Sequence, residues 1–259
     1  MSKLTKNQKI IRNFDRQQKI IVPDGENLEL IIVLDEIQYS DRNREIFVTI
    51  ECHSHSECQV VWYNKSFHQS SCKLDVHYIL HDHAILSESI YLTDHDALEW
   101  KEHYQIGYAA KLNVTALFMR NQPSTLQYHS NIIHSADKGQ SNVLIKAVHF
   151  DDQQTDCCGE IQIHPTVKDV SASYYNHHLV FAANPIIMAE PQLTIQSGEV
   201  ECRHGVTISE MDAEALFYMM SRGLTIEQVQ TLIVDSFCSP CLNHPSIKSL
   251  YYDMLPRRV

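Results

Sequence analysis

Residues 73–80 read Lys-Leu-Asp-Val-His-Tyr-Ile-Leu, with an apolar side chain at every second position. Because successive side chains of a strand point to opposite faces, this alternation is typical of a strand with one buried face. The same pattern recurs at residues 160–164, which read Glu-Ile-Gln-Ile-His. Similar short runs follow brief polar spacers from residue 27 to about residue 200. The sequence therefore predicts a mainly β fold over most of the chain.

The number of glycines bears on how these strands are connected. The chain has only 7 glycines, and its sole Asp-Gly pair is Asp24-Gly25, whereas tight hairpins usually need Asn-Gly or Asp-Gly. A sandwich or barrel built from hairpins is therefore not well supported. Short strands at fairly even spacing instead suit a solenoid, in which each coil buries its inner face against its neighbours.

The end of the chain has a helical pattern instead. Apolar residues recur at helical spacing over residues 212–221, and Gly223 suits the stop of that helix. Thr225 and Gln228 have the spacing of a capping box, and Pro245 suits the first turn of a third helix. The middle helix places its apolar residues on one face, namely Ile226, Val229, Leu232, Ile233 and Phe237.

These patterns divide the chain into three parts. We expect an N-terminal lead-in over residues 1–26, a β core over residues 27–210 and a helical docking module over residues 211–259. The short helices would cover the end of the solenoid or dock a partner, because the terminal coil of a solenoid needs a cover.

Charge and motifs argue against several classes of function. The net charge of −11 argues against nucleic acid as the main partner, because phosphate binding needs clustered positive charge. No apolar run is long enough to cross a bilayer, and residues 1–19 lack the apolar core of a signal peptide. The 8 cysteines then indicate reduced thiols, so we expect a cytoplasmic protein. No P-loop, G-x-S-x-G or H-E-x-x-H motif is present.

Cys202 and His204 are the strongest candidate ligands. They stand two apart in a strand-like run, so their side chains point the same way. A thiol beside an imidazole is a suitable binding pair for iron or zinc. Two ligands from one chain cannot close a tetrahedral site, so a partner subunit would have to complete it. The alternative is a buried thiol beside a hydrogen-bonded histidine.

The other cysteines are weaker candidates. Cys238 and Cys241 form a C-x-x-C pair with His244 nearby, but no second pair completes a zinc knuckle, so a structural pair at a helix end is favoured. The adjacent Cys157 and Cys158 face opposite sides of a strand, and we interpret them as structural.

Residues 52–55 read Cys-His-Ser-His. In a strand, His53 and His55 share one face and could hold a metal there. Solvated strand histidines are the favoured interpretation.

Residues 191–223 carry the most functional information. They read PQLTIQSGEVECRHGVTISEMDAEALFYMMSRG, and this stretch resembles the core of the SufB/SufD family, the scaffold subunits of the Suf iron–sulfur cluster assembly machine. The Cys-x-His-Gly-x-Thr run from Cys202, the Leu-Phe-Tyr run from Leu216 and the Ser-Arg-Gly run from Ser221 look like the D-type subunit. The resemblance is best over residues 134–238.

The two subunit types differ at positions that this sequence allows us to compare. B-type subunits carry a cysteine in the strand that aligns near Asn176 and His177, and they read Glu-His-Glu-Ala-Thr-Thr where this chain has Cys-Arg-His-Gly-Val-Thr from Cys202. Both differences favour the D-type, although Phe237-Cys238 is slightly more similar to B-type sequences. Family members usually carry a helical region ahead of the core, whereas this chain begins almost directly in strands and looks like a short form.

The resemblance implies a right-handed parallel β-helix and a non-catalytic scaffold. It implies that His204 and Cys202 hold a transient iron–sulfur cluster at a subunit interface, and that the chain itself binds no nucleotide. The β-helix would pair with a SufB-like subunit or a second copy of the chain. The helices would dock a SufC-like ABC ATPase through Phe217, Tyr218, Arg222, Val229, Leu232, Ile233 and Phe237.

Other classes stay open. The chain could be a B-type subunit or a metal-free β-helix interaction module. A polysaccharide-acting enzyme on a β-helix would need an acid cluster on one coil face, and the sequence does not reveal one.

Overall fold

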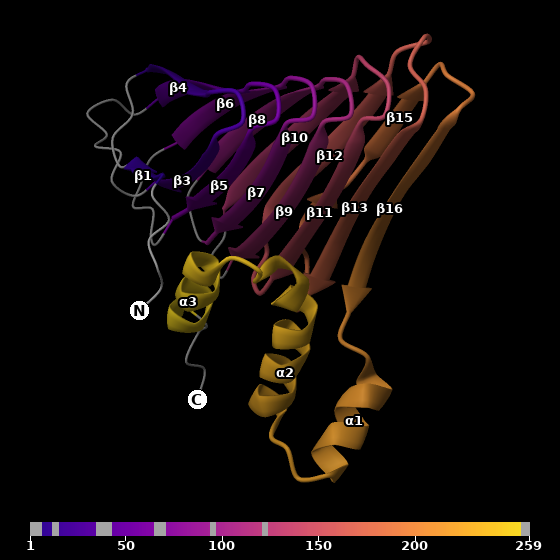
Figure 1. Ribbon diagram of the computed structural model, residues 1–259. Helices are drawn as coiled ribbons and strands as arrows, with labels where there is room; N and C mark the ends of the chain where they lie inside the picture. The colour runs from indigo at the N-terminus through magenta and orange to yellow at the C-terminus, as the bar shows by residue number, and fades with distance from the viewer. Residues whose placement is uncertain are drawn as a thin grey trace.

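The computed structural model describes residues 7–11, 16–34, 43–64, 71–93, 97–120 and 124–254. Two sheets face each other across the interior, and each coil of the chain adds one strand to each (Figure 1). Every pairing between the described strands is parallel. The prediction of a mainly β chain folded as a parallel β-helix is therefore confirmed.

The two sheets take alternate strands of the chain. Sheet A contains, in spatial order, β1 (Gln8–Ile11), β3 (Asn27–Val33), β5 (Glu57–Tyr63), β7 (Ile85–Leu92), β9 (Lys111–Arg120), β11 (Gln140–His149), β13 (Val170–Val180) and β16 (Val200–Glu210). Sheet B contains β2 (Gln17–Val22), β4 (Asn43–Cys52), β6 (Ser71–Leu80), β8 (Ala97–Ile106), β10 (Thr125–His134), β12 (Gln154–Ile163) and β14 (Ile186–Met188), and β15 (Pro191–Ile195) also pairs with β12.

The interior between the sheets holds the main core. Leu74, Val76 and Tyr78 are buried there, as the alternation of residues 73–80 predicts. Because parallel strands keep residues of like register on one face, side chains of successive coils stack in rows. Tyr78 stacks on Tyr104 of the next coil at 4.9 Å between ring centroids.

The turns between the sheets repeat a single backbone feature. Six described turns from a strand of sheet B to the next strand of sheet A each contain one residue with positive φ, namely Gly25, His55, His83, Ala109, Lys138 and Asp169. The N–H of that residue donates to a carbonyl of the following coil, as His83 does to Tyr108 at 2.8 Å. Most of these residues are not glycine, which explains how few glycines suffice for a long series of turns.

The C-terminal segment is helical, as expected. α1 (Ala213–Ser221) begins at the N-cap Asp212, and α2 (Ile226–Cys238) begins with the capping box of Thr225 and Gln228. The short 3-10 helix η2 (Ser239–Cys241) and α3 (Pro245–Met254) follow.

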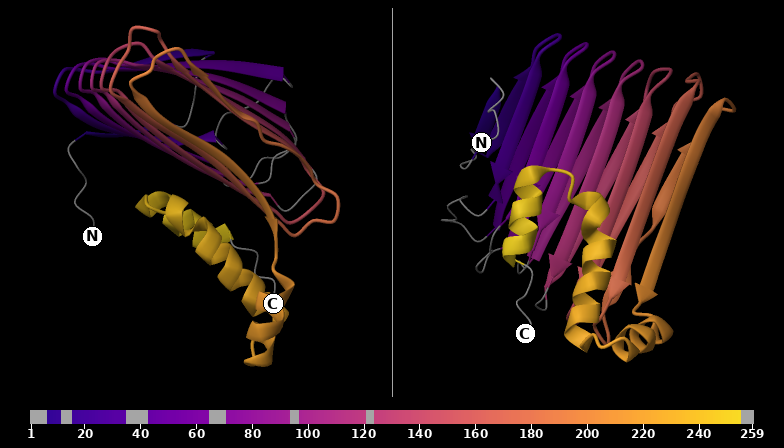
Figure 2. Two further views of the ribbon diagram at one scale, coloured as in Figure 1. Left: turned by 90° about the vertical axis from the view of Figure 1, so that its right-hand side faces the viewer. Right: turned by 60° about the horizontal axis from the view of Figure 1, so that its bottom comes forward.

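The sequence suggested that the helices would cover the end of the solenoid or dock a partner. In the structure they do not cover its end. Instead α2, η2 and α3 lie along the outer face of sheet A, while α1 extends away from it (Figure 2). A second apolar cluster forms there between the sheet and the helices, which contribute Val234, Cys238, Cys241, Ile247 and Tyr251. The apolar residues on the outer face of sheet A explain this choice, because they would otherwise face water.

The solenoid also begins earlier than residue 27. Within the expected lead-in, β1 pairs with β3 and β2 pairs with β4. The apolar runs that form these two strands are short and stand among lysines and arginines, which hid them from the sequence pattern.

Candidate functional site

β16 is the last strand of sheet A and pairs with β13. The register places Cys202 beside Ala172 and His204 beside Tyr174. Ala172 and Tyr174 both belong to the interior core. Since neighbouring parallel strands share faces at matched register, Cys202 and His204 lie on the interior-facing side of the last coil, where no described strand follows in sheet A.

The two side chains differ in their exposure. His204 is exposed to solvent, whereas Cys202 is half-buried and packs against the interior core. Burial, and to a lesser extent the charge of Glu201, raises the pKa of the Cys202 thiol. Arg203 points to the opposite face and forms an ion pair with Glu201 at 2.5 Å. A thiolate at Cys202 would therefore need a nearby cation or a metal to stabilise it.

Exposed apolar side chains share the interior-facing side of the last coil with this pair. Val206 and Ile208 follow on the same side of β16 and are 37% and 54% exposed. Ile195 of β15, which pairs with the interior residue Ile163, is 37% exposed as well. We call the surface formed by Cys202, His204, Val206, Ile208 and Ile195 the open end. Exposed apolar residues that gather around polar ligands are typical of a surface that a partner covers.

The residues predicted to dock a partner fall into two groups. Phe217, Tyr218 and Leu232 are 76%, 59% and 50% exposed, and Arg222 lies over the Tyr218 ring. They form an exposed group on α1 and α2.

The remaining docking candidates of α2 are turned inward. Val229 is fully buried, and Ile233 and Phe237 pack against the outer-face cluster of sheet A. Lys146 of that sheet lies 4.3 Å over the Phe237 ring. The structure therefore leaves the exposed group as the surface that a partner can reach.

The C-x-x-C pair lies inside the second apolar cluster. Cys238 and Cys241 are buried, and burial raises the pKa of each thiol to about 12. His244 is engaged elsewhere, because its Nε2 lies 2.9 Å from a carboxylate oxygen of Glu29 and its Nδ1 accepts the N–H of Ser246. These contacts fit the structural interpretation of the pair.

The histidines of residues 52–55 do not share a strand face. β4 ends at Cys52, and His55 has a positive φ in the turn that follows. Each contacts the next coil instead: His53 meets His81 at 5.2 Å and His55 stacks on His83 at 4.8 Å between ring centroids. The turn separates the pair that a continuous strand would have aligned.

The adjacent cysteines of β12 face opposite sides, as expected, but they differ in character. Cys157 is buried in the interior core. Cys158 is half-buried on the outer face of sheet B, beside His129 and Asp156. Burial and the hydrogen bond to Asp156 raise the pKa of the Cys158 thiol to about 11. The interpretation of Cys158 as structural missed these neighbours, because strand register cannot be read from a single sequence.

The comparisons with known proteins agree with this architecture. The sequence model of the SUF system FeS cluster assembly, SufBD core domain matches residues 8–237. A SufBD family iron–sulfur cluster assembly protein of Synechocystis is 29% identical over 142 residues, which cover 55% of this chain and 31% of the relative. Protein ABCI7 of Arabidopsis thaliana, a chloroplastic protein, is 27% identical over 136 residues, covering 52% and 29% of the two chains.

The iron–sulfur cluster assembly protein SufD of Escherichia coli is also similar. It is 23% identical over 177 residues, covering 63% of this chain and 40% of SufD. The chain thus spans less than half the length of these curated relatives. Among the residues that the structure describes, no helix is both long enough and apolar enough to span a membrane.

Proposed function

The chain belongs to the SufB/SufD core family of iron–sulfur cluster assembly proteins, and we propose that it is a non-catalytic, D-type scaffold subunit. The observation that carries this proposal is the placement of Cys202 and His204 on one side of the exposed terminal strand β16. The similarity to SufD of E. coli supports the D-type. So does the lack of cysteine at Asn176 and His177.

In this role the chain supplies ligands for a nascent cluster. Thiolate and imidazole are suitable donors for iron, and both bind in the deprotonated state. Cys202 and His204 provide two donors, so the remaining ligands come from another subunit across the open end. The cluster is the cargo of the complex, and the chain holds it only while it is assembled.

The open end suits pairing with a SufB-like subunit or a second copy of this chain. β16 offers one unpaired strand edge in sheet A, since it pairs with β13 on one side, and an exposed edge can extend the sheet into a partner. The exposed apolar side chains of Val206, Ile208 and Ile195 would be buried by that contact.

The exposed group on α1 and α2 suits a second partner. Phe217 and Tyr218 of α1 and Leu232 of α2 are exposed, and Arg222 adds a cation beside Tyr218. Aromatic and arginine side chains of this kind are enriched at interface hot spots. We assign this exposed group to the docking of a SufC-like ABC ATPase.

A single substitution tests the ligand role. His204→Ala should abolish the iron–sulfur absorbance of the assembled complex. The melting temperature and the subunit composition of the complex should stay the same, because His204 is exposed. His177→Ala is the matched control, since His177 lies on the neighbouring strand and faces the other side. It should keep normal cluster content.

Two results would contradict the proposal. Normal cluster content in His204→Ala would show that the imidazole is not a ligand. Cluster loss that merely follows a lower melting temperature would indicate a structural histidine, as would equal losses in His204→Ala and His177→Ala.

A further inference from the structure

We propose that His129, Asp156 and Cys158 bind one zinc ion on the outer face of sheet B. This site lies on other strands than Cys202 and His204, and it goes beyond the scaffold function. One ligand atom of each residue lies within 4.8 Å of the others. Since zinc holds nitrogen, oxygen and sulfur ligands at about 2.0–2.3 Å, small side-chain rotations bring all three onto one ion.

Strand register brings the three residues together. His129 of β10 pairs directly with Cys158 of β12. Asp156 stands two residues before Cys158, so both point to the same face of the strand. All three therefore project from one patch of the sheet and need no loop to position them.

The sheet is interrupted on the other side of Cys158. β14 pairs with β12 up to Asp156 and Met188, and β15 resumes the pairing at Gly159 and Pro191. Glu190, in the break, therefore lies opposite Cys158. The backbone of Glu190 favours the thiolate form of Cys158, although burial raises the pKa of that thiol overall.

The contacts of Asp156 suggest that a cation belongs between these groups. Its Oδ1 lies 3.0 Å from the Cys158 sulfur, and its Oδ2 lies 3.1 Å from Nε2 of His129. Asp156 is only 9% exposed. Nε2 of His129 is itself buried and has no hydrogen bond of acceptable geometry among the described residues. Buried charged groups are normally paired or coordinate a metal.

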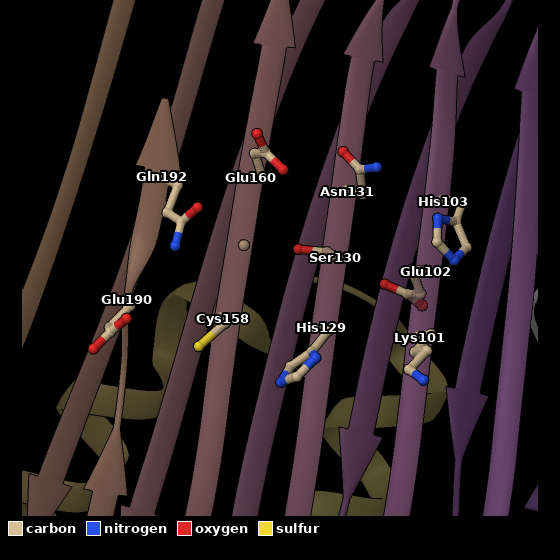
Figure 3. Close-up of a pocket in the computed structure, with 11 residues that line it drawn as sticks. Lys101, Glu102, His103, His129, Ser130, Asn131, Cys158, Glu160, Glu190 and Gln192 are labelled. Carbon is tan, nitrogen blue, oxygen red and sulfur yellow. The ribbon is translucent and has the colours of Figure 1, made fainter. Parts of the chain in front are cut away.

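An open groove of about 320 Å³ gives access to the site. His129, Cys158 and Glu190 line it in succession from neighbouring strand segments (Figure 3). Three protein ligands leave one tetrahedral position for water or for the Glu190 carboxylate. A sulfur, a nitrogen and an oxygen donor together suit zinc better than magnesium or calcium, which prefer oxygen alone.

Two other clusters on this face are less suited to zinc. In the cluster of Glu51, His53 and His81, Lys19 already lies 2.8 Å from the Glu51 carboxylate. The cluster of Asp75, His77 and His103 contains no sulfur. These clusters therefore serve as internal comparisons for the experiment.

The experiment uses the full chain, reduced with a phosphine and stripped of metal with a chelator. Cobalt(II) is the probe, because it replaces zinc and reports its ligands through its absorbance. We expect one cobalt per chain with a thiolate-to-cobalt charge-transfer band, which zinc then removes by displacement. Cys158→Ser should abolish that band, and His129→Gln should weaken binding at least about tenfold.

Matched controls separate this site from the others. Cys202→Ser removes the other half-buried thiol, and His103→Gln removes a histidine of the sulfur-free cluster; both should bind cobalt as the unchanged chain does. The proposal is overturned if the band persists in Cys158→Ser, if Cys202→Ser removes it, or if no stoichiometric cobalt binds. None of these readouts depends on cluster assembly, so failure here is distinct from failure of the scaffold function.

Discussion

Glu88 and Glu102 lie in the interior of the solenoid and are 1% and 0% exposed. Tyr78 and Tyr128 donate hydrogen bonds to Glu88 and Glu102 respectively. The Tyr104 hydroxyl lies 2.5 Å from Glu88 and 2.6 Å from Glu102. A phenol has one proton to donate, so the three groups fit together when at least one carboxyl group is protonated. Burial accordingly raises the pKa of both glutamates.

This network predicts a pH dependence of stability. Burial raises the pKa of Glu102 from the usual 4.5 to about 7, so the folded chain binds more protons than the unfolded chain between these values. The free energy of unfolding therefore falls as pH rises from about 4.5 to about 7. In Glu102→Gln this contribution disappears. Between pH 4.5 and 7 the melting temperature of the variant should therefore fall by a few degrees less than that of the unchanged chain.

Glu99→Gln provides the control for this prediction. Glu99 lies on the same strand but on the outer face, where Lys101 and Lys73 lower the pKa of its carboxyl group to about 2. Its substitution should leave the dependence of the melting temperature on pH unchanged between pH 4.5 and 7. Equal pH profiles for Glu102→Gln and the unchanged chain would contradict the assignment.

Sequence alternation places such residues on the correct face but does not reveal their partners. Leu74 and Val76 are inward in both the pattern and the structure. Glu102 follows the same alternation within β8, yet a glutamate is seldom fully buried unless it is paired. Its phenol partner Tyr128 comes from the following coil, and only the register of the strands brings the two together.

At the scale of elements, the turns show what each coil demands of its residues. Ala109 has φ of 51° in the turn before β9, a conformation that costs a residue with a Cβ about 1 kcal/mol or more. Its neighbour Ala110 is buried in the interior core. Ala109→Gly should therefore be neutral or stabilise the chain by up to about 1 kcal/mol.

Ala110→Gly is the contrasting substitution. It removes a buried methyl group and adds freedom to the unfolded chain, so it should destabilise by about 1 kcal/mol or more. Denaturant unfolding of the two variants measures both effects. Destabilisation of the same size in both would show that the turn conformation imposes no cost on Ala109.

The same turns show how far sequence reasoning about elements reaches. The scarcity of glycine correctly argued against hairpins, because every described pairing is parallel. It could not reveal that His55, Lys138 and other residues take the left-handed conformation. The N–H bonds between coils hold them there, and these depend on contacts about one coil away in sequence. The break between β14 and β15 beside Cys158 escaped notice for the same reason.

At the scale of the whole molecule, the helices were foreseen but their position was not. The capping box of Thr225 and the start at Pro245 are local signals, and both are confirmed. An apolar helix face, however, suits the end of a solenoid as well as its side. The apolar outer face of sheet A determines where the helices pack. Residues such as Tyr91, Leu117 and Val148 form this one apolar surface only after the coils stack.

This placement changes how docking of the ATPase can be tested. Removing residues 225–259 would strip α2, η2 and α3 from the outer face of sheet A and expose its apolar cluster. Such a truncated chain should melt at a lower temperature and aggregate. A loss of binding in that variant would therefore carry no information about the docking surface.

Point substitutions on the exposed group avoid that problem. Phe217→Asp and Leu232→Asp alter side chains that are 76% and 50% exposed, so the melting temperature should stay close to that of the unchanged chain. Each should weaken binding of a SufC-like ATPase by about tenfold or more, because a charge then replaces an apolar anchor. Tyr252→Asp, at a side chain 54% exposed on α3, should bind normally. A titration of ATPase against the three variants decides: unchanged affinity in the first two, or an equal loss in the third, would place the docking surface away from α1 and α2.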